Sequence, residues 1–171
     1  MTAEEPVARI TISVGDSLPT QSAVGPLFNG SVVDAPADGP TVQGVYQLAN
    51  DDLGRYLAHD GSNAVTSADG DDPATQWRVI SDGEFVYFQS VANDQFLDAD
   101  ERALTYNVDI NPDLADTDGQ WELVDFGDGT TLIRNVEFGR YLDADTRASN
   151  VKTTTVPAVN GAQWNLVQVD G

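Results

Sequence analysis

The segment DINPDLADTDG, which begins at Asp109, has acidic and amide side chains at alternate positions. This spacing resembles a metal-binding loop more than any other in the chain. Asp109, Asn111 and Asp113 have the 1-3-5 spacing of a calcium-binding helix–loop–helix loop. That motif also needs a Gly and a bidentate Glu at places where this segment has Leu114 and Gln120. We therefore keep these three residues as an incomplete calcium candidate, favour a solvated acidic loop, and expect no cofactor.

Groups for nucleophilic or acid–base catalysis are sparse. The chain has no Cys, which excludes disulfides and thiolate metal sites, and its one His is His59. No Ser lies in a nucleophile-elbow motif, and Asp residues in loops lack the apolar cleft that raises a catalytic carboxyl pKa. We expect no catalytic residues, a chain that is not an enzyme, and a surface position for His59.

The charge of the chain is strongly negative. The net charge is -20, with 22 Asp among 28 acidic residues and a single Lys, Lys152. At molar salt the screening length falls to about 3 Å, so the self-repulsion of such a chain largely disappears. The composition therefore favours a halophilic protein over an acidic surface for a basic partner. It argues against nucleic acid binding, which needs a basic stripe.

Two sequence motifs recur in the same order along the chain. Gln-Trp pairs contain all three Trp residues, Trp77, Trp121 and Trp164, spaced by 44 and 43 positions. An aromatic–Leu pair precedes each one, at Tyr56-Leu57, Phe96-Leu97 and Tyr141-Leu142. Because both motifs keep the same phase, they indicate three internal repeats, which we place at 44–82, 83–128 and 129–171.

Each repeat contains short alternating segments separated by turns rich in Gly, Asp and Asn, and no amphipathic helix stands out. Several strands in each of three repeats predict a closed all-β structure, and three copies are too few for a propeller. We therefore predict a β-trefoil of three repeats of about 43 residues. Each aromatic–Leu pair and each Trp is expected to fill one third of a shared core.

The combination GRYLDAD and AQWNLV resembles the repeats of ricin-type lectins and fascin-like β-trefoils over residues 44–171. It departs from them because Gln and Trp are adjacent and an aromatic residue replaces Cys. The resemblance implies that the Asp after the Leu, Asp98 or Asp143, accepts hydrogen bonds from sugar hydroxyls. Repeat one has Ala58 there, which implies an inactive site.

The resemblance also implies further sugar contacts near each Asp. Tyr106 and Asn107 follow Asp98 in repeat two, and Asn150 follows Asp143 in repeat three. The alternative is that these acids only form turns or a salt-adapted surface. The Arg residues after turn glycines, Arg55 and Arg140, could pair with acids or recognise a carboxylated glycan.

Residues 1–43 lie outside the repeats. VARITISV alternates well enough for one strand in an otherwise extended arm, and we expect Val7, Ile10, Ile12 and Val14 to be buried against another subunit. This predicts an N-terminal assembly arm at 1–43 and a trefoil domain at 44–171. The alternative is a disordered leader.

Together these features predict a non-catalytic, lectin-like, homo-oligomeric protein of a halophile that binds a cell-surface glycan. No secretion signal and no apolar run long enough to span a membrane stand in the sequence. We favour an outward-facing subunit of an assembly, such as a haloarchaeal virus surface protein. The alternatives are a purely structural knob of that assembly or an intracellular lectin-like domain.

Overall fold

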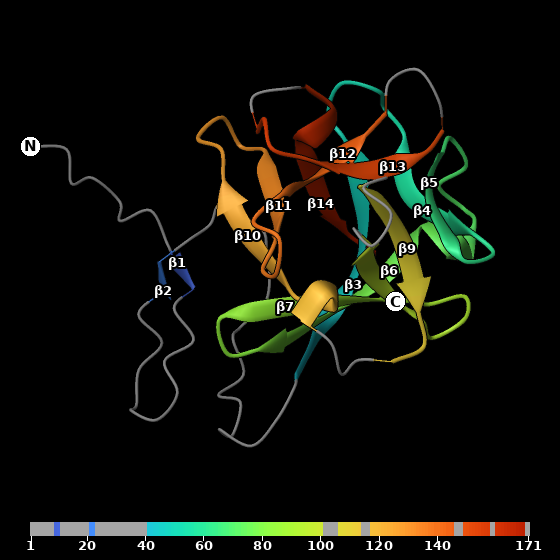
Figure 1. The fold of residues 1–171 in the computed structure, drawn as a ribbon, viewed down its shortest axis with the longest axis horizontal. Coiled ribbons are helices and arrows are strands. Elements are labelled where there is room, and N and C mark those ends of the chain that lie inside the picture. The colour runs from blue at the N-terminus through green and yellow to red at the C-terminus, as the bar shows by residue number, and fades with distance from the viewer. Residues whose placement is uncertain are drawn as a thin grey trace, which may run out of the picture.

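Strands make up almost all of the regular structure. The computed structural model describes residues 9–10, 21–22, 41–100, 106–113, 117–145, 149–157 and 160–169. Within the described part of 41–169, three repeats each contribute four strands and one short 3₁₀ turn (Figure 1). The predicted all-β trefoil is thereby confirmed.

The elements follow one order in every repeat. Repeat one contains β3 (Thr41–Asn50), β4 (Tyr56–Asp60), β5 (Asn63–Ser67), η2 (Pro73–Thr75) and β6 (Gln76–Asp82). Repeat two contains β7 (Phe85–Ser90), β8 (Phe96–Asp100), β9 (Asn107–Asn111), η3 (Thr117–Gly119) and β10 (Trp121–Asp125). Repeat three contains β11 (Thr131–Asn135), β12 (Tyr141–Ala144), β13 (Val151–Thr154), η4 (Asn160–Ala162) and β14 (Trp164–Gln168).

The first and fourth strands of the repeats close into a six-stranded barrel. Antiparallel pairing runs from β3 to β6, β7, β10, β11 and β14, and β14 pairs back onto β3. Closure leaves the ring without a free edge, although β7–β10 and β11–β14 each meet at a single residue pair.

The second and third strands of each repeat form a hairpin, and the three hairpins join to cap the barrel. The hairpins are β4–β5, β8–β9 and β12–β13. Strand β9 bridges to β5 and β13, and Val65 of β5 bridges to Asn150. Alternation decides which residues face inward: in β5 and β9 the even positions are buried and the odd ones are partly exposed.

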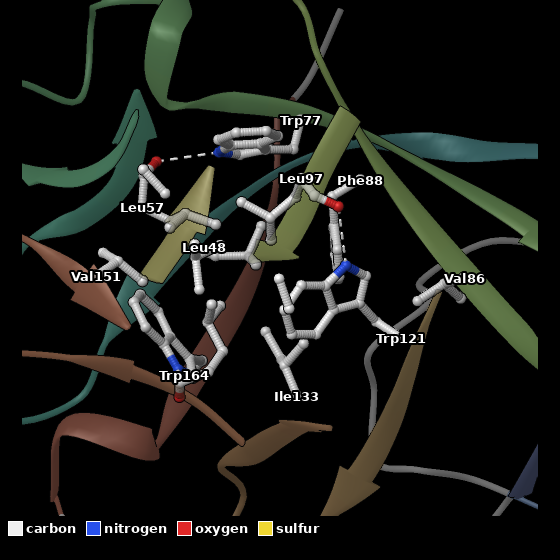
Figure 2. Close-up of a cluster of buried hydrophobic side chains, with 14 of the residues drawn as sticks. Leu48, Leu57, Trp77, Val86, Phe88, Leu97, Trp121, Ile133, Val151 and Trp164 are labelled. Atoms are coloured by element: carbon white, nitrogen blue, oxygen red, sulfur yellow. Dashed lines mark hydrogen bonds between the residues drawn. The ribbon is translucent and has the colours of Figure 1, made fainter. Parts of the chain in front are cut away.

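The three indoles fix each hairpin to the barrel. Every Trp is fully buried, and its Nε1 donates to the carbonyl of the Leu in the aromatic–Leu pair of its own repeat (Figure 2). The donor–acceptor distances are 3.0 Å for Trp77–Leu57, 3.1 Å for Trp121–Leu97 and 3.0 Å for Trp164–Leu142. The same Leu side chains join the central cluster, so this prediction of a shared core is right for Leu and Trp.

The prediction that the aromatic partner of each Leu fills the core is wrong. Tyr56, Phe96 and Tyr141 are partly exposed, whereas the Leu after each is fully buried. Adjacent strand residues point to opposite faces, so the Leu and the aromatic residue cannot both face inward. Aromatic residues of the first strands fill the core instead: Tyr46 in β3 and Phe88 in β7 are both fully buried.

The last residue of the first strand ties neighbouring repeats together. Asn50 Nδ2 donates to the Gly161 carbonyl at 2.9 Å, and Asn135 Nδ2 donates to the Asp118 carbonyl at 2.6 Å. Both carbonyls belong to the 3₁₀ turn of the preceding repeat around the barrel. Repeat two has Ser90 at this place, and its hydroxyl is too short to copy the amide.

His59 compensates for the shorter Ser90. The ring Nε2 of His59 and the Ser90 hydroxyl share a hydrogen bond of 2.8 Å, and the ring meets Trp77 edge-on at 6.0 Å between centroids. The equivalent positions facing Asn135 and Asn50 hold the small residues Ala99 and Ala144. His59 is thus half-buried rather than at the surface as expected, because it fills the space that a longer amide fills elsewhere.

The N-terminal segment lies mostly outside the described residues. Two short strands, β1 (Arg9–Ile10) and β2 (Gln21–Ser22), pair with Arg9 opposite Ser22. Strand β3 begins at Thr41 and pairs with β6 from its first residue, three residues before the expected boundary at 44. The side chains expected in an assembly contact, at positions 7, 10, 12 and 14, fall outside the described ones.

Truncating one buried indole should strongly destabilise the fold. Trp121→Ala removes a fully buried ring and should cost about 3–5 kcal/mol. Trp121→Phe keeps much of the volume but leaves the Leu97 carbonyl unpaired, for about 1–3 kcal/mol. Denaturant unfolding gives both values. Val167→Ala, at a side chain that is 48% exposed, is the control and should change little, whereas an unchanged Trp121→Phe would contradict the anchoring role.

Stability should carry a pH dependence that belongs to His59. Burial lowers the pKa of His59, against the opposing Asp72 and Asp60 carboxylates. Its contribution is therefore complete above the unfolded value of about 6.5 and is lost as the pH falls toward the lower folded-state pKa. The double variant His59→Ala/Ser90→Asn recreates the pattern of the other repeats and should lose less stability than the wild type between about pH 7.5 and 5.5. Equal losses in the two proteins would show that His59 does not titrate this way.

Candidate functional site

Two carboxylates occupy the same place on the outward faces of two hairpins. Asp98 lies in β8 opposite Asp109 of β9, and Asp143 lies in β12 opposite Lys152 of β13. Although both face away from the central cluster, they are only 6% and 8% exposed. An acid this deeply buried next to the surface is costly unless it is compensated, which makes both positions candidates for ligand recognition.

In repeat three the carboxylate is held between a cation and the backbone. Lys152 Nζ lies 3.6 Å from Asp145 Oδ2 and 4.0 Å from Asp143 Oδ2. Burial raises the pKa of Asp143, while Lys152 opposes the rise. On the other side, a Cβ at Gly161 would lie 2.2 Å from Asp143 Oδ1, so only glycine lets the η4 backbone approach this closely.

Repeat two builds the same place with a second acid, Asp109, where repeat three has Lys152. Asn111 Nδ2 donates to Asp98 Oδ2 at 2.9 Å, and Asn107 Nδ2 donates to Asp109 Oδ1. Two acidic side chains therefore lie on adjacent strands of one hairpin face. In repeat one the corresponding residues are Ala58 and Val65, so that face has no carboxylate at this position.

The amides that we assigned to sugar binding lie elsewhere, around the pseudo-threefold axis. Asn107 Nδ2 donates to Asn63 Oδ1 at 2.7 Å, Asn63 Nδ2 to Asn150 Oδ1 at 2.8 Å, and Asn150 Nδ2 to Asn107 Oδ1 at 3.3 Å. The three amides thus form a closed ring in which each donates to one neighbour and accepts from the other. Asn63 was missed, although each Asn lies at the start of the third strand or, for Asn150, directly before it, so the shared phase was visible.

Tyr106 lies at a seam between hairpins. Its carbonyl accepts a hydrogen bond of 2.7 Å from Thr153 N, and the Arg140 guanidinium lies 3.9 Å above its ring centroid. Arg140 itself donates to the Thr153 hydroxyl and carbonyl at 2.9 and 3.0 Å. Tyr106 is therefore joined to repeat three, whereas the sequence placed it beside Asp98.

The calcium candidate does not form a loop around one point. Asp109 and Asn111 belong to the extended strand β9, and Asn111 Oδ1 accepts from the backbone N of Asp113 at 3.0 Å. Across the described residues, no group of three or more acidic or His side chains is arranged to hold a metal ion.

Comparison with known proteins supplies the family. The family model described as "Ricin-type beta-trefoil lectin domain-like" matches residues 73–158, just over half of the chain. The chain belongs to this family. Its fold and the resemblance noted from the GRYLDAD and Gln-Trp motifs agree.

Proteins similar to this ricin-type trefoil are diverse. The ulvan lyase NLR42 of Nonlabens ulvanivorans is 26% identical over 127 residues, which cover 71% of this chain and 23% of that enzyme. The designed threefold-symmetric protein ThreeFoil superposes with a TM-score of 0.67 at 23% identity, covering 73% of this chain and 99% of that one. The ricin B-like lectin of Macrolepiota procera, solved with lactose, has a TM-score of 0.66 at 11% identity, covering 75% and 98%.

These comparisons contradict one expectation and support another, carbohydrate binding, in general terms. The expectation that the chain is not an enzyme is contradicted, because its curated relative is a polysaccharide lyase. The expectation rested on the lack of a nucleophile motif or an acid pair in an apolar cleft, and a single sequence does not reveal that an ulvan lyase contains a similar segment. The family and fold support carbohydrate binding. Among the described residues, no helix combines the length and apolar character that a membrane crossing requires.

Proposed function

We propose that this ricin-type trefoil binds saccharides through the outward faces of the β12–β13 and β8–β9 hairpins. The observation that carries the proposal is the repeated buried carboxylate, Asp143 in one hairpin and Asp98 in the other. Repeat one, with Ala58, has the same backbone without the acid. The fold therefore does not need an acid there, and a ligand is the natural reason to retain two.

Repeat three supplies the more complete set of groups. A carboxylate accepts hydrogen bonds from two sugar hydroxyls, and such charge-assisted bonds are stronger than neutral ones. Burial raises the pKa of Asp143 and Lys152 opposes that rise, while its ammonium adds a donor at the rim of the same face. The close backbone of η4 fixes the carboxylate from below, so its orientation is set before a ligand arrives.

Repeat two offers a different recognition chemistry. Asp98 is oriented by the Asn111 amide, and Asp109 adds a second carboxylate where repeat three has Lys152. Two carboxylate acceptors on one face favour a saccharide rich in hydroxyl donors. We infer that the two hairpins select different sugars or different residues of one polymer.

The relationship to an ulvan lyase points to polysaccharides as ligands. The shared segment is about a quarter of that enzyme, so the lyase contains a region like this chain together with other sequence. We infer that the trefoil brings a carbohydrate-active protein or particle to its polymer. Ulvan is therefore a rational first probe.

The wider setting is part of the proposal. The charge of -20 and the 22 Asp residues support a halophilic origin. We keep the presentation of the trefoil on an assembly, such as a haloarchaeal virus surface with residues 1–43 as the anchor, as a prediction. If that prediction holds, the saccharide that the trefoil binds is a glycan on the surface of the host cell.

Removing either carboxylate should weaken saccharide binding. A hydrogen bond to a charged group contributes about 1.5–3 kcal/mol, so Asp143→Asn or Asp98→Asn should lower affinity by about 10–150-fold for the sugar of that hairpin. The double variant should not bind. Calorimetry with ulvan and hits from a glycan array, in molar salt, gives the values.

The control is Asp82→Asn, which makes the same charge change at an exposed site on β6 and should bind normally. Circular dichroism checks that all variants fold. Undiminished binding by the double variant would refute the site, and failure of the wild-type chain to bind any saccharide would refute the function.

Stability should rise with salt over the molar range. Screening relieves the repulsion within a chain of charge -20, so the melting temperature should increase from about 0.1 to 3 M NaCl or KCl. Thermal unfolding monitored by Trp fluorescence measures this. A flat or falling melting temperature would contradict the halophilic assignment while leaving the saccharide sites untouched.

A further inference from the structure

The carboxylate of Asp143 is almost completely buried, yet it lacks a hydrogen-bond donor. Only 8% of the residue is exposed. Its contact with Lys152 is an ion pair in which 4.0 Å separates Nζ from Oδ2, too long for a hydrogen bond. Within the described ranges of the chain, no backbone or side-chain group donates a hydrogen bond to it. An ionised carboxylate can accept about four such bonds, so this one retains unused acceptor capacity.

The equivalent carboxylate of repeat two has the donor that repeat three lacks. Asn111 donates from Nδ2 to Asp98 Oδ2 at 2.9 Å, while its Oδ1 accepts from the backbone N two residues later at 3.0 Å. Repeat three has Thr154 at this position of its hairpin. The Thr154 hydroxyl keeps the bond to the backbone N two residues later, at 3.2 Å, but it supplies no amide donor. The fold therefore forms the same turn with or without a donor to the carboxylate.

The charged groups around Asp143 have opposite effects on it. Lys152 of β13 favours its ionised form, whereas Asp145, which lies 3.6 Å from the same ammonium, opposes it. Arg134 of the neighbouring strand β11 is paired with Glu122 at 2.8 Å. The turn η4, which packs on β12, consists of Asn, Gly and Ala and brings no titratable group.

Burial dominates this balance. Desolvation raises the pKa of Asp143 above its ordinary value, Lys152 lowers it, and Asp145 raises it again. A proton therefore binds Asp143 at a pH at which an exposed carboxyl group is still ionised. Sugar hydroxyls that donate to the carboxylate favour its ionised form, so a sugar and a proton compete for the same oxygens.

We propose that the β12–β13 face is a proton-gated saccharide site, in which ionised Asp143 holds sugar hydroxyls and a proton on Asp143 releases them. This inference rests on the proposed saccharide-binding function and adds regulation to one of its two hairpins. Protonation replaces charge-assisted hydrogen bonds by weaker neutral ones. Affinity should therefore be complete above the folded-state pKa of Asp143 and should fall as the pH drops through it.

The first test is the titration of Asp143 itself in the full chain. The pH dependence of its side-chain carboxyl carbon resonance gives the pKa in the free protein, which should lie above that of an exposed Asp. A neutral sugar is the ligand, because it has no titratable group: lactose first, then the neutral glycans that bind on the array. Saturating sugar should lower this pKa. An ordinary or low pKa in the free protein, or one that bound sugar leaves unchanged, overturns the gate.

The second test transplants the missing amide. Asp98→Asn serves as the parent, so that repeat three is the site measured. Calorimetry with the neutral sugar should show at least about threefold weaker binding at about pH 4 than at about pH 7.5. Adding Thr154→Asn should reduce this loss, because the new amide stabilises ionised Asp143 as Asn111 does for Asp98. Adding Thr154→Ser, which keeps the hydroxyl and brings no amide, is the matched control and should lose affinity as the parent does.

The outcomes separate the gate from the proposed function. If the parent binds the neutral sugar equally at both pH values, or if Thr154→Asn and Thr154→Ser lose the same affinity, the gate is refuted and the proposed function stands. If the wild-type chain binds no saccharide, both are refuted. Both Thr154 variants retain His59, so its titration cannot produce a difference between them. Circular dichroism at the two pH values shows that the effects are not those of unfolding.

Discussion

The hydrogen bond from each buried indole to a leucine carbonyl is the contact on which the rest of this trefoil depends. It joins the fourth strand of a repeat to its hairpin, so it connects the barrel to the cap three times over. Because the Trp and Leu residues are fully buried, the indole N–H and the Leu carbonyl would each be costly to leave without a partner. Because the hairpin is fixed at its Leu, the next residue is held at a set height on the outward face.

That next residue is where the repeats differ. Ala58, Asp98 and Asp143 follow the three anchored leucines on equivalent backbones, with neighbours of different charge. A rigid inner face thus carries an outer face that can vary without disturbing it. This separation explains how one family fold is found in lectins, in a designed symmetric protein and beside a lyase.

The features that could be predicted from the sequence are those that recur in every repeat. The Trp and Leu spacings were enough to find the repeats, the closed β fold and the core, because each residue serves its own repeat in the same manner. The sequence placed the acids after the leucines through family resemblance. The half-buried aromatics, Tyr56 among them, were misplaced because residue type was given more weight than strand alternation.

What the sequence could not show was contact between repeats. The pairing of His59 with Ser90 depends on two substitutions, 31 positions apart, that only make sense once the repeats are packed. The stack of Arg140 on Tyr106 likewise joins different repeats across a seam. Local patterns carry no information about which non-equivalent residues meet, so such exceptions need the structure.

The asparagine ring at the axis has a consequence for substitutions within the repeats. Asn63, Asn107 and Asn150 each complete the hydrogen bonds of two others, in one rotational sense, so a change in any one strands a donor and an acceptor at once. The three repeats are therefore coupled at this point, because none of the three Asn residues can change without leaving partners in both other repeats unpaired. The hairpin faces carry no such coupling, so residues there can differ from one repeat to the next.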